Sequence, residues 1–142
     1  HAQVVETVLI PDEREQIEAE LVRLADSGSV DLILTTGGTG FAPRDVTPEA
    51  TANVIERLAP GITEAMRAES AKITPHAQLS RAIAGIRGRT LIINLPGSPK
   101  AAVENLKVFL PALPHAVETL RGEAYECGSR EPEHAPHPTS QD

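Results

Sequence analysis

Two apolar, β-branched runs with a helical pattern between them constrain the fold of this chain most strongly. The runs are residues 4–10 and 30–35, and both read as short buried strands. Between them Ile17, Leu21 and Leu24 repeat at spacings of four and three, which predicts an amphipathic helix ending near residues 26–28. Strand, helix and strand in this order predict a parallel βαβ unit with a right-handed crossover.

Helix starts are marked by residues with capping chemistry. Asp12 is placed to cap the first helix. Thr47 is expected to cap a second helix, with Pro48 at its first position, and that helix runs to about Leu58. Pro60-Gly61 ends it, and a third helix follows over residues 62–71.

The second half of the chain predicts a hairpin and a long helix. Apolar runs at residues 82–86 and 90–95, joined by Arg87-Gly88-Arg89, predict two strands and a tight turn. Ser98 and Pro99 are expected to open a helix with an apolar stripe over residues 103–120. Two prolines inside it, at positions 111 and 114, should kink or split it.

These elements predict an α/β three-layer sandwich with a mostly parallel central sheet, helices on both faces and a small β-hairpin. A length of 142 residues suits one domain. We expect the domain to span residues 1–122 and residues 123–142 to form a polar, flexible C-terminal tail. Ligands of such sheets bind at the carboxyl ends of strands, so the loops after three strands are expected to converge on one cleft.

Composition excludes several classes of function. The net charge is −7, aromatic residues make up 2% and there is no basic run, which argues against binding to nucleic acid or to an anionic membrane. No apolar run is long enough to span a bilayer. The single Cys127 cannot form an internal disulfide, which fits a reducing compartment and predicts a cytoplasmic protein.

The glycine turn, residues 37–40, follows the second strand. Its exposed backbone N–H groups are suited to an anion, although a plain tight turn is the better explanation of the glycines taken alone. No Gly-Lys-Ser/Thr follows, so it is not a P-loop. Asp12 and Asp45 both follow strands and could hold Mg²⁺ on a nucleotide, or could serve only as a cap and a turn residue.

The remaining polar candidates carry little weight by themselves. Ser70, Ser80 and Asn94 stand near strand ends or irregular segments, where turn chemistry is the simpler explanation. Cys127 has no neighbouring base pattern and there is no Gly-x-Ser-x-Gly sequence, which argues against a covalent hydrolase.

Longer motifs give these residues a context. The run from Leu32 to Gly40, followed by Pro-Arg-Asp-Val-Thr-Pro-Glu-Ala-Thr over residues 43–51, resembles the signature of the MogA/MoaB family. Leu79-Ser80-Arg81, the run at 84–88 and Leu-Ile-Ile-Asn-Leu-Pro-Gly-Ser-Pro at 91–99 reinforce the resemblance, which covers roughly residues 8–122. These sequence motifs are most similar to those of the G domains of gephyrin and of the plant molybdenum-cofactor protein.

The resemblance implies a molybdopterin adenylyltransferase, a nucleotidyltransferase of molybdenum cofactor biosynthesis. Such an enzyme transfers AMP from Mg-ATP to the terminal phosphate of molybdopterin and releases pyrophosphate. It also implies a homotrimer and a partnership with a molybdenum-insertase domain in the same pathway or chain. Two alternatives remain, namely a molybdopterin-binding domain acting in molybdenum insertion and a non-catalytic trimeric scaffold.

The resemblance also implies roles for individual residues. Asp12 and Asp45 match acidic residues expected to act in catalysis and to bind Mg²⁺. The expected substrate-binding residues are Gly37, Gly38, Thr39, Gly40, Ser70, Ser80, Asn94, Pro96, Gly97 and Ser98. Because both substrates are anionic and the chain is acidic, Arg44, Arg81, Lys100 and helix N-termini are expected to supply local positive potential.

One departure from the family pattern concerns the start of the sheet. Members of the family begin with a further strand carrying a Val-Ser-Asp type motif and then a segment with Asp-x-Ser-Gly. Neither motif occurs in this sequence. We therefore expect the family's first strand to be absent from the printed residues and the sheet formed by them to lack a central member.

Overall fold

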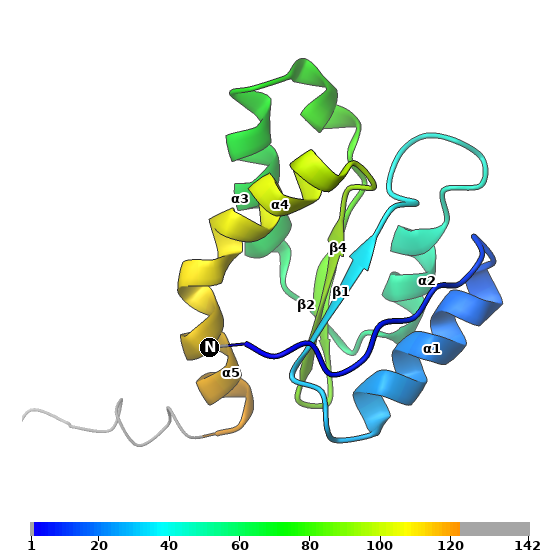
Figure 1. Cartoon of the computed structure of the whole chain (residues 1–142), viewed down its shortest axis with the longest axis vertical. Coiled ribbons are helices and arrows are strands. Elements are labelled where there is room, and N and C mark those ends of the chain that lie inside the picture. Colours follow the sequence, from blue (N-terminus) through cyan, green and yellow to red (C-terminus); the bar gives the residue numbers. More distant parts are fainter. Residues whose placement is uncertain (1, 123–142) are drawn as a thin grey trace, which may run out of the picture.

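A four-stranded sheet in the order β1-β4-β3-β2 forms the centre of the fold (Figure 1). The computed structural model describes residues 2–122. The strands are β1 (Leu32–Thr36), β2 (Arg57–Leu58), β3 (Ala84–Arg87) and β4 (Thr90–Leu95). β1 is parallel to β4, with Leu32 opposite Leu91 and Thr36 opposite Leu95, and β3 is antiparallel to both β4 and β2.

Two helices cover one face of the sheet. They are α1 (Arg14–Asp26) and α2 (Thr47–Val54). Their apolar stripes meet the sheet in a core cluster that consists of Ile17, Leu21, Ala25, Ile33, Ala50, Val54 and Ile92. The helical spacing seen in the sequence therefore marks the buried face of α1, as expected for an amphipathic helix.

The other face is covered by α3 (Pro60–Ala71) and α4 (Pro99–Phe109). Their core cluster consists of Met66, Ala84, Leu91, Ile93, Leu95, Ala102 and Phe109. Neighbouring residues of β4 thus point into different clusters, Ile92 into the first and Ile93 into the second, because side chains alternate along a strand. All six residues of β4 are buried, and the predicted three-layer α/β arrangement with helices on both faces is confirmed.

The hairpin and the split helix were both predictable and are confirmed. β3 and β4 pair as antiparallel neighbours, and Gly88 between them has φ +59°. The C-terminal helical region breaks at its prolines into α4, a 3₁₀ turn η2 (Leu110–Ala112) and α5 (Leu113–Leu120). A second 3₁₀ turn, η1 (Pro75–Leu79), lies between α3 and β3. No helix within residues 2–122 is long and apolar enough to cross a membrane.

The prediction of a buried strand over residues 4–10 was wrong. This segment belongs to no strand, and Val4 is 82% and Leu9 100% exposed, while only Ile10 packs partly against the first core cluster. β-branched residues favour a pleated surface, but a strand also needs a neighbour that accepts its backbone hydrogen bonds. Within residues 2–122 the sheet ends at β1, and the segment is instead tied to α1 by an ion pair of 2.6 Å between Glu6 and Arg23.

Two further details differ from expectation. Only one of the three strand pairings in the described residues is parallel, so the sheet is mixed and not mostly parallel. The second helix ends at Val54, before β2, because residues 57–58 pair with β3.

The expected helix caps also require correction in part. Ser98 caps α4 by accepting a hydrogen bond from Ala101 N, as predicted. In contrast, α1 follows Glu13 without a side-chain cap, and Thr47 is the first residue of α2. Asp12 and Thr47 contact the glycine turn, as described below. Residues 123–142, with Cys127 and the predicted tail, lie outside the described residues, so the proposed domain limits stay a prediction.

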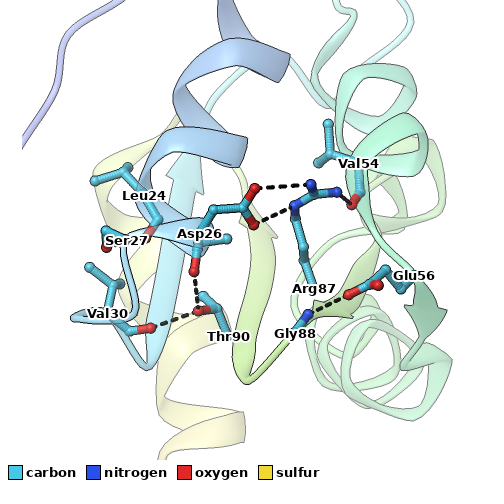
Figure 2. A network of polar contacts seen from close by, with 10 residues as sticks. Leu24, Asp26, Ser27, Val30, Val54, Glu56, Arg87, Gly88 and Thr90 are labelled. Carbon is cyan, nitrogen blue, oxygen red and sulfur yellow. Dashed lines mark hydrogen bonds and ion pairs between the residues drawn. The ribbon is translucent and has the colours of Figure 1, made fainter.

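A polar network ties the helices to the far end of the sheet from the glycine turn (Figure 2). Arg87 donates to both carboxylate oxygens of Asp26 at 3.0 and 3.1 Å, and to the carbonyl oxygen of Val54 at 2.9 Å. Thr90 donates to the carbonyl oxygen of Val30 at 2.7 Å. These bonds join the end of α1, the end of α2 and the hairpin, so they fix both helices against the sheet.

The Asp26–Arg87 pair is expected to make stability depend on pH. Hydrogen bonds from Arg87, aided by its charge, hold the pKa of Asp26 below its ordinary value. The carboxylate therefore stabilises the fold above its unfolded-state pKa, and this contribution is lost as the pH falls through the lower folded-state pKa. Asp26→Asn should lower the unfolding free energy at neutral pH, with a smaller deficit at an acid pH below the folded-state pKa of Asp26. Urea unfolding at both pH values checks this, and an equal deficit at the two would contradict it.

Candidate functional site

The carboxyl ends of β1 and β4 lie side by side because the two strands are parallel neighbours. The N–H group of Gly37 donates to the carbonyl oxygen of Leu95 at 3.0 Å. A methyl group placed on Gly97 would lie 3.2 Å from the Cα atom of Gly37, so the two backbones approach closely. The glycine turn and the second loop (Pro96, Gly97 and Ser98) therefore meet at one edge of the sheet, where ligands of α/β sheets bind.

Asp12 joins the same edge from the start of α1. A methyl group on Gly38, which has φ +68°, would lie 2.3 Å from Thr47 Oγ1 and 3.6 Å from Asp12 Oδ1. The N–H group of Thr47 also donates to the carbonyl oxygen of Gly38 at 3.2 Å. Only a residue without a side chain fits there, and the segment before α1, the glycine turn and the start of α2 come together around Gly38.

Asp45 closes the segment that follows the glycine turn. Its Oδ2 atom accepts a hydrogen bond of 2.9 Å from the N–H group of Ala42. The same atom would lie 3.0 Å from a methyl group placed on Gly40. Asp45 is half-buried, so its carboxylate is fixed beside the glycine turn by a local bond and by the lack of a side chain at position 40.

The two carboxylates define what kind of metal ion this edge could hold. Asp12 lies against Gly38 and Asp45 against Gly40, so both flank the glycine turn. Residues 2–122 contain no group of three or more His, Cys, Asp or Glu side chains placed to hold a metal. A donor set of two carboxylates fits Mg²⁺, which commonly takes one or two carboxylates and completes its shell with water and phosphate oxygens.

The three expected cations differ in their surroundings. Arg81 forms an ion pair with Glu49, so its charge is already balanced within the protein. Lys100 is 84% exposed and lies 4.0 Å from Glu104, and Arg44 is exposed in the loop that follows the glycine turn. Lys100 and Arg44 are therefore more exposed to solvent than Arg81.

The predicted serines are held by bonds within the protein. Ser70 Oγ, in the last turn of α3, accepts from Asn105 Nδ2 of α4 at 3.1 Å. Ser80 Oγ accepts from the N–H group of Ala82 at 3.3 Å, and Ser98 Oγ caps α4 at 3.5 Å. Each hydroxyl thus has one fixed acceptor contact, which orients it while its own hydrogen remains to be donated.

Asn94 lies beneath the glycine turn, fully buried in β4. Its Nδ2 atom donates to the hydroxyls of Thr35 and Thr51 at 2.9 and 3.0 Å, and its Oδ1 atom accepts from the N–H group of Ile83 at 3.2 Å. The side chain of Asn94, which was predicted to bind substrate, therefore forms hydrogen bonds within the protein through both Nδ2 and Oδ1. It ties β1, α2 and the residue before β3 together under the site.

Asn94→Ala is expected to destabilise the protein by about 1–3 kcal/mol, because it leaves buried hydrogen-bonding groups without partners. Urea unfolding measures the change. The matched control is Asn53→Ala, which removes a single 2.6 Å bond to Glu18 from an exposed asparagine and should stay within about 0.5 kcal/mol of the wild type. An Asn94→Ala protein as stable as the control would contradict this account of the buried amide.

Two hollows on the described surface lie elsewhere. One, of about 530 Å³, is lined by polar residues of α1 and by Asn53. The other, of about 440 Å³, lies between the start of α3 and the end of α4 and is mainly apolar. Neither includes a residue of the glycine turn, so the candidate site is identified by the loops that converge at the sheet edge.

Comparison with known proteins places this arrangement among molybdenum cofactor proteins. Residues 1–115 match the family described as "Probable molybdopterin binding domain". The molybdopterin adenylyltransferase of Helicobacter pylori (strain 26695) is 49% identical over 114 residues, which are 80% of this chain and 65% of that protein. Gephyrin of Dictyostelium discoideum is 57% identical over 109 residues, 77% of this chain and 15% of that protein.

Solved structures agree with the fold. The molybdopterin biosynthesis enzyme MoaB from Thermus thermophilus superimposes with a TM-score of 0.75 and 55% identity, covering 80% of this chain and 72% of that one. The chain spans about two thirds of the Helicobacter relative and a much smaller part of gephyrin. Similarity is thus to a domain that occurs both in short proteins and within longer ones.

Proposed function

We propose that this chain, which belongs to the probable molybdopterin binding domain family, acts as a molybdopterin adenylyltransferase in molybdenum cofactor biosynthesis. It would transfer AMP from Mg-ATP to the terminal phosphate of molybdopterin and release pyrophosphate. The observation that carries the proposal is the meeting of the glycine turn, Asp12, Asp45 and the second loop at one sheet edge. Relatives with the adenylyltransferase name support it at 49% and 52% identity.

The proposed chemistry needs no nucleophile from the protein. An oxygen of the molybdopterin phosphate attacks the α-phosphorus of ATP, and the bond from that phosphorus to the bridging oxygen of pyrophosphate breaks. Such reactions depend on holding the phosphates in line and neutralising their charge. A site built from backbone N–H groups and carboxylates is suited to that task.

The individual roles that we propose are those that the family resemblance implies. Asp12 and Asp45 would hold Mg²⁺, which when bound would offset negative charge on the ATP phosphates. Gly37, Gly38, Thr39 and Gly40 would direct backbone N–H groups at phosphate or pterin. Pro96, Gly97 and Ser98 would line the second loop, Ser70 and Ser80 would serve the pterin side, and Asn94 would support the turn from below.

The assembly and location of the protein are further parts of the proposal. We infer a cytoplasmic homotrimer that hands its product to a molybdenum-insertase domain in the same pathway or chain. The link to a further domain in the same chain is supported by gephyrin, where the segment similar to this chain makes up only 15% of the length. The competing functions are a molybdopterin-binding domain acting in molybdenum insertion and a non-catalytic trimeric scaffold.

A product assay separates these functions. The purified protein is incubated with molybdopterin and Mg-ATP, and the products are resolved by chromatography and mass. Formation of adenylyl-molybdopterin and pyrophosphate in equal amounts is expected. A protein that binds molybdopterin but forms no adenylyl product would contradict the enzymatic proposal and leave the scaffold.

A further inference from the structure

Arg81 spans the space between two segments that are far apart in sequence. Its Nε atom donates to the carbonyl oxygen of Gly40 at 2.8 Å and its Nη2 atom to the carbonyl oxygen of Asp45 at 2.6 Å. Its Nη1 atom binds the carboxylate of Glu49 in the first turn of α2, and its backbone N–H donates to the carbonyl oxygen of Thr39 at 2.8 Å. One residue thus contacts the loop from Thr39 to α2 at four points.

The partners of Arg81 are groups of the protein itself. Glu49 balances the charge of Arg81. The Nε and Nη2 atoms of Arg81 donate to backbone carbonyl oxygens, which any residue type would offer. The second oxygen of Glu49, Oε2, is buried and has no hydrogen-bond partner within the described residues. Arg81 is therefore the counter-charge of the Glu49 carboxylate, in a pair whose side chains are 35% and 41% exposed.

The segment carrying Arg81 is itself held from behind. Arg67 of α3 donates to the carbonyl oxygen of Ala82 at 2.8 Å and lies 3.5 Å from that of Ser80. These bonds fix residues 80–82 to α3 through Arg67, which lies about one helical turn before Ser70. The loop from Thr39 to Asp45 is thereby connected through Arg81 to a rigid helix.

We propose that Arg81 is a positioning residue that fixes the loop between Thr39 and Asp45, and with it the Asp45 carboxylate, for the reaction. The inference rests on the proposed function for its catalytic part, while the ordering of the loop stands on the contacts alone. Planar, forked donors suit three acceptors spread around one side chain, whereas lysine offers a compact charge on a flexible stem. Arg81→Lys should therefore keep the charge and lose the positioning.

The experiment compares Arg81→Lys with Arg87→Lys in the whole protein. Arg87 makes the same kinds of contact, with a carboxylate and a carbonyl oxygen, at the opposite end of the sheet (Figure 2). Amide hydrogen exchange of residues 39–45 should accelerate at least about tenfold in Arg81→Lys and stay unchanged in Arg87→Lys. The kcat for AMP transfer should fall by about 10–100-fold in Arg81→Lys alone, with the KM for molybdopterin within about threefold of wild type.

The outcomes separate this inference from the proposed function. Unchanged exchange of residues 39–45 in Arg81→Lys overturns the positioning role, whatever the activity. Faster exchange together with wild-type kcat also overturns it, because the ordered loop would then not matter to the reaction. If the wild type transfers no AMP, the proposed function fails, and the exchange measurement alone decides whether Arg81 orders the loop.

Discussion

Asp45→Asn is expected to lower the rate of AMP transfer by about 10²–10³-fold, because the negative charge that we propose holds Mg²⁺ beside the reacting phosphates is lost. The asparagine side chain keeps an oxygen that can accept the 2.9 Å hydrogen bond from the N–H group of Ala42. The turn should therefore retain its shape while the negative charge disappears. Asp45→Ala would remove both, so the asparagine variant isolates the charge.

Initial rates at saturating molybdopterin, measured over a range of Mg²⁺ concentrations, test this expectation. The matched control is Asp31→Asn, since Asp31 precedes β1 and pairs with Arg121 at 2.6 Å, at the other end of that strand from the glycine turn. The control should transfer AMP at the wild-type rate. An Asp45→Asn protein with full activity would remove Asp45 from the proposed metal site.

Gly38→Ala is expected to reduce both stability and activity. A β-carbon there would lie 2.3 Å from Thr47 Oγ1, so either the glycine turn or the start of α2 must shift. The backbone also has φ +68°, which is unfavourable for alanine by about 1–2 kcal/mol. Adding the crowding, typically about 1–3 kcal/mol, gives an expected loss of about 2–5 kcal/mol in unfolding free energy.

Gly28→Ala separates the two contributions. Gly28 has a similar φ of +75°, but a β-carbon there would meet nothing within 4 Å, so the substitution carries only the backbone cost. Urea unfolding of both variants should show Gly38→Ala to be less stable than Gly28→Ala by about 1–3 kcal/mol. AMP transfer should be impaired only in Gly38→Ala. Equal losses of stability in the two variants would show that the turn and Thr47 are not tightly packed.

Much of the fold could be predicted because its signals are local. Pro111 and Pro114 divide the last helix where the chain loses N–H donors, and Ser98 caps α4 through a bond to a residue three positions away. The strand at residues 4–10 could not be predicted correctly from composition. Its side chains favour a sheet, but pairing depends on a neighbouring strand that no local pattern specifies.

In the candidate site, too, local motifs could be predicted from the sequence, whereas contacts between distant residues could not. The glycine turn and the second loop could be found from motifs, and their approach follows from the parallel pairing of β1 and β4. Arg81 and Glu49 stand 32 positions apart, and nothing in their spacing indicates that one binds the other. Asn94 was predicted to bind substrate, but its burial beneath α2 depends on tertiary packing, which directs its amide to Thr35 and Thr51 and away from solvent.

The central claim is that the protein transfers AMP from ATP to molybdopterin. The most direct test is to determine which phosphate of ATP enters the molybdopterin product. The protein is mixed with molybdopterin and Mg-ATP labelled either on the α-phosphate or on the γ-phosphate, and the label in the molybdopterin product is counted. Adenylyl transfer predicts that α-label enters the product in equal amount to the pyrophosphate released, and that all γ-label leaves in pyrophosphate. Label from the γ-phosphate in the product, or none from either, would contradict it.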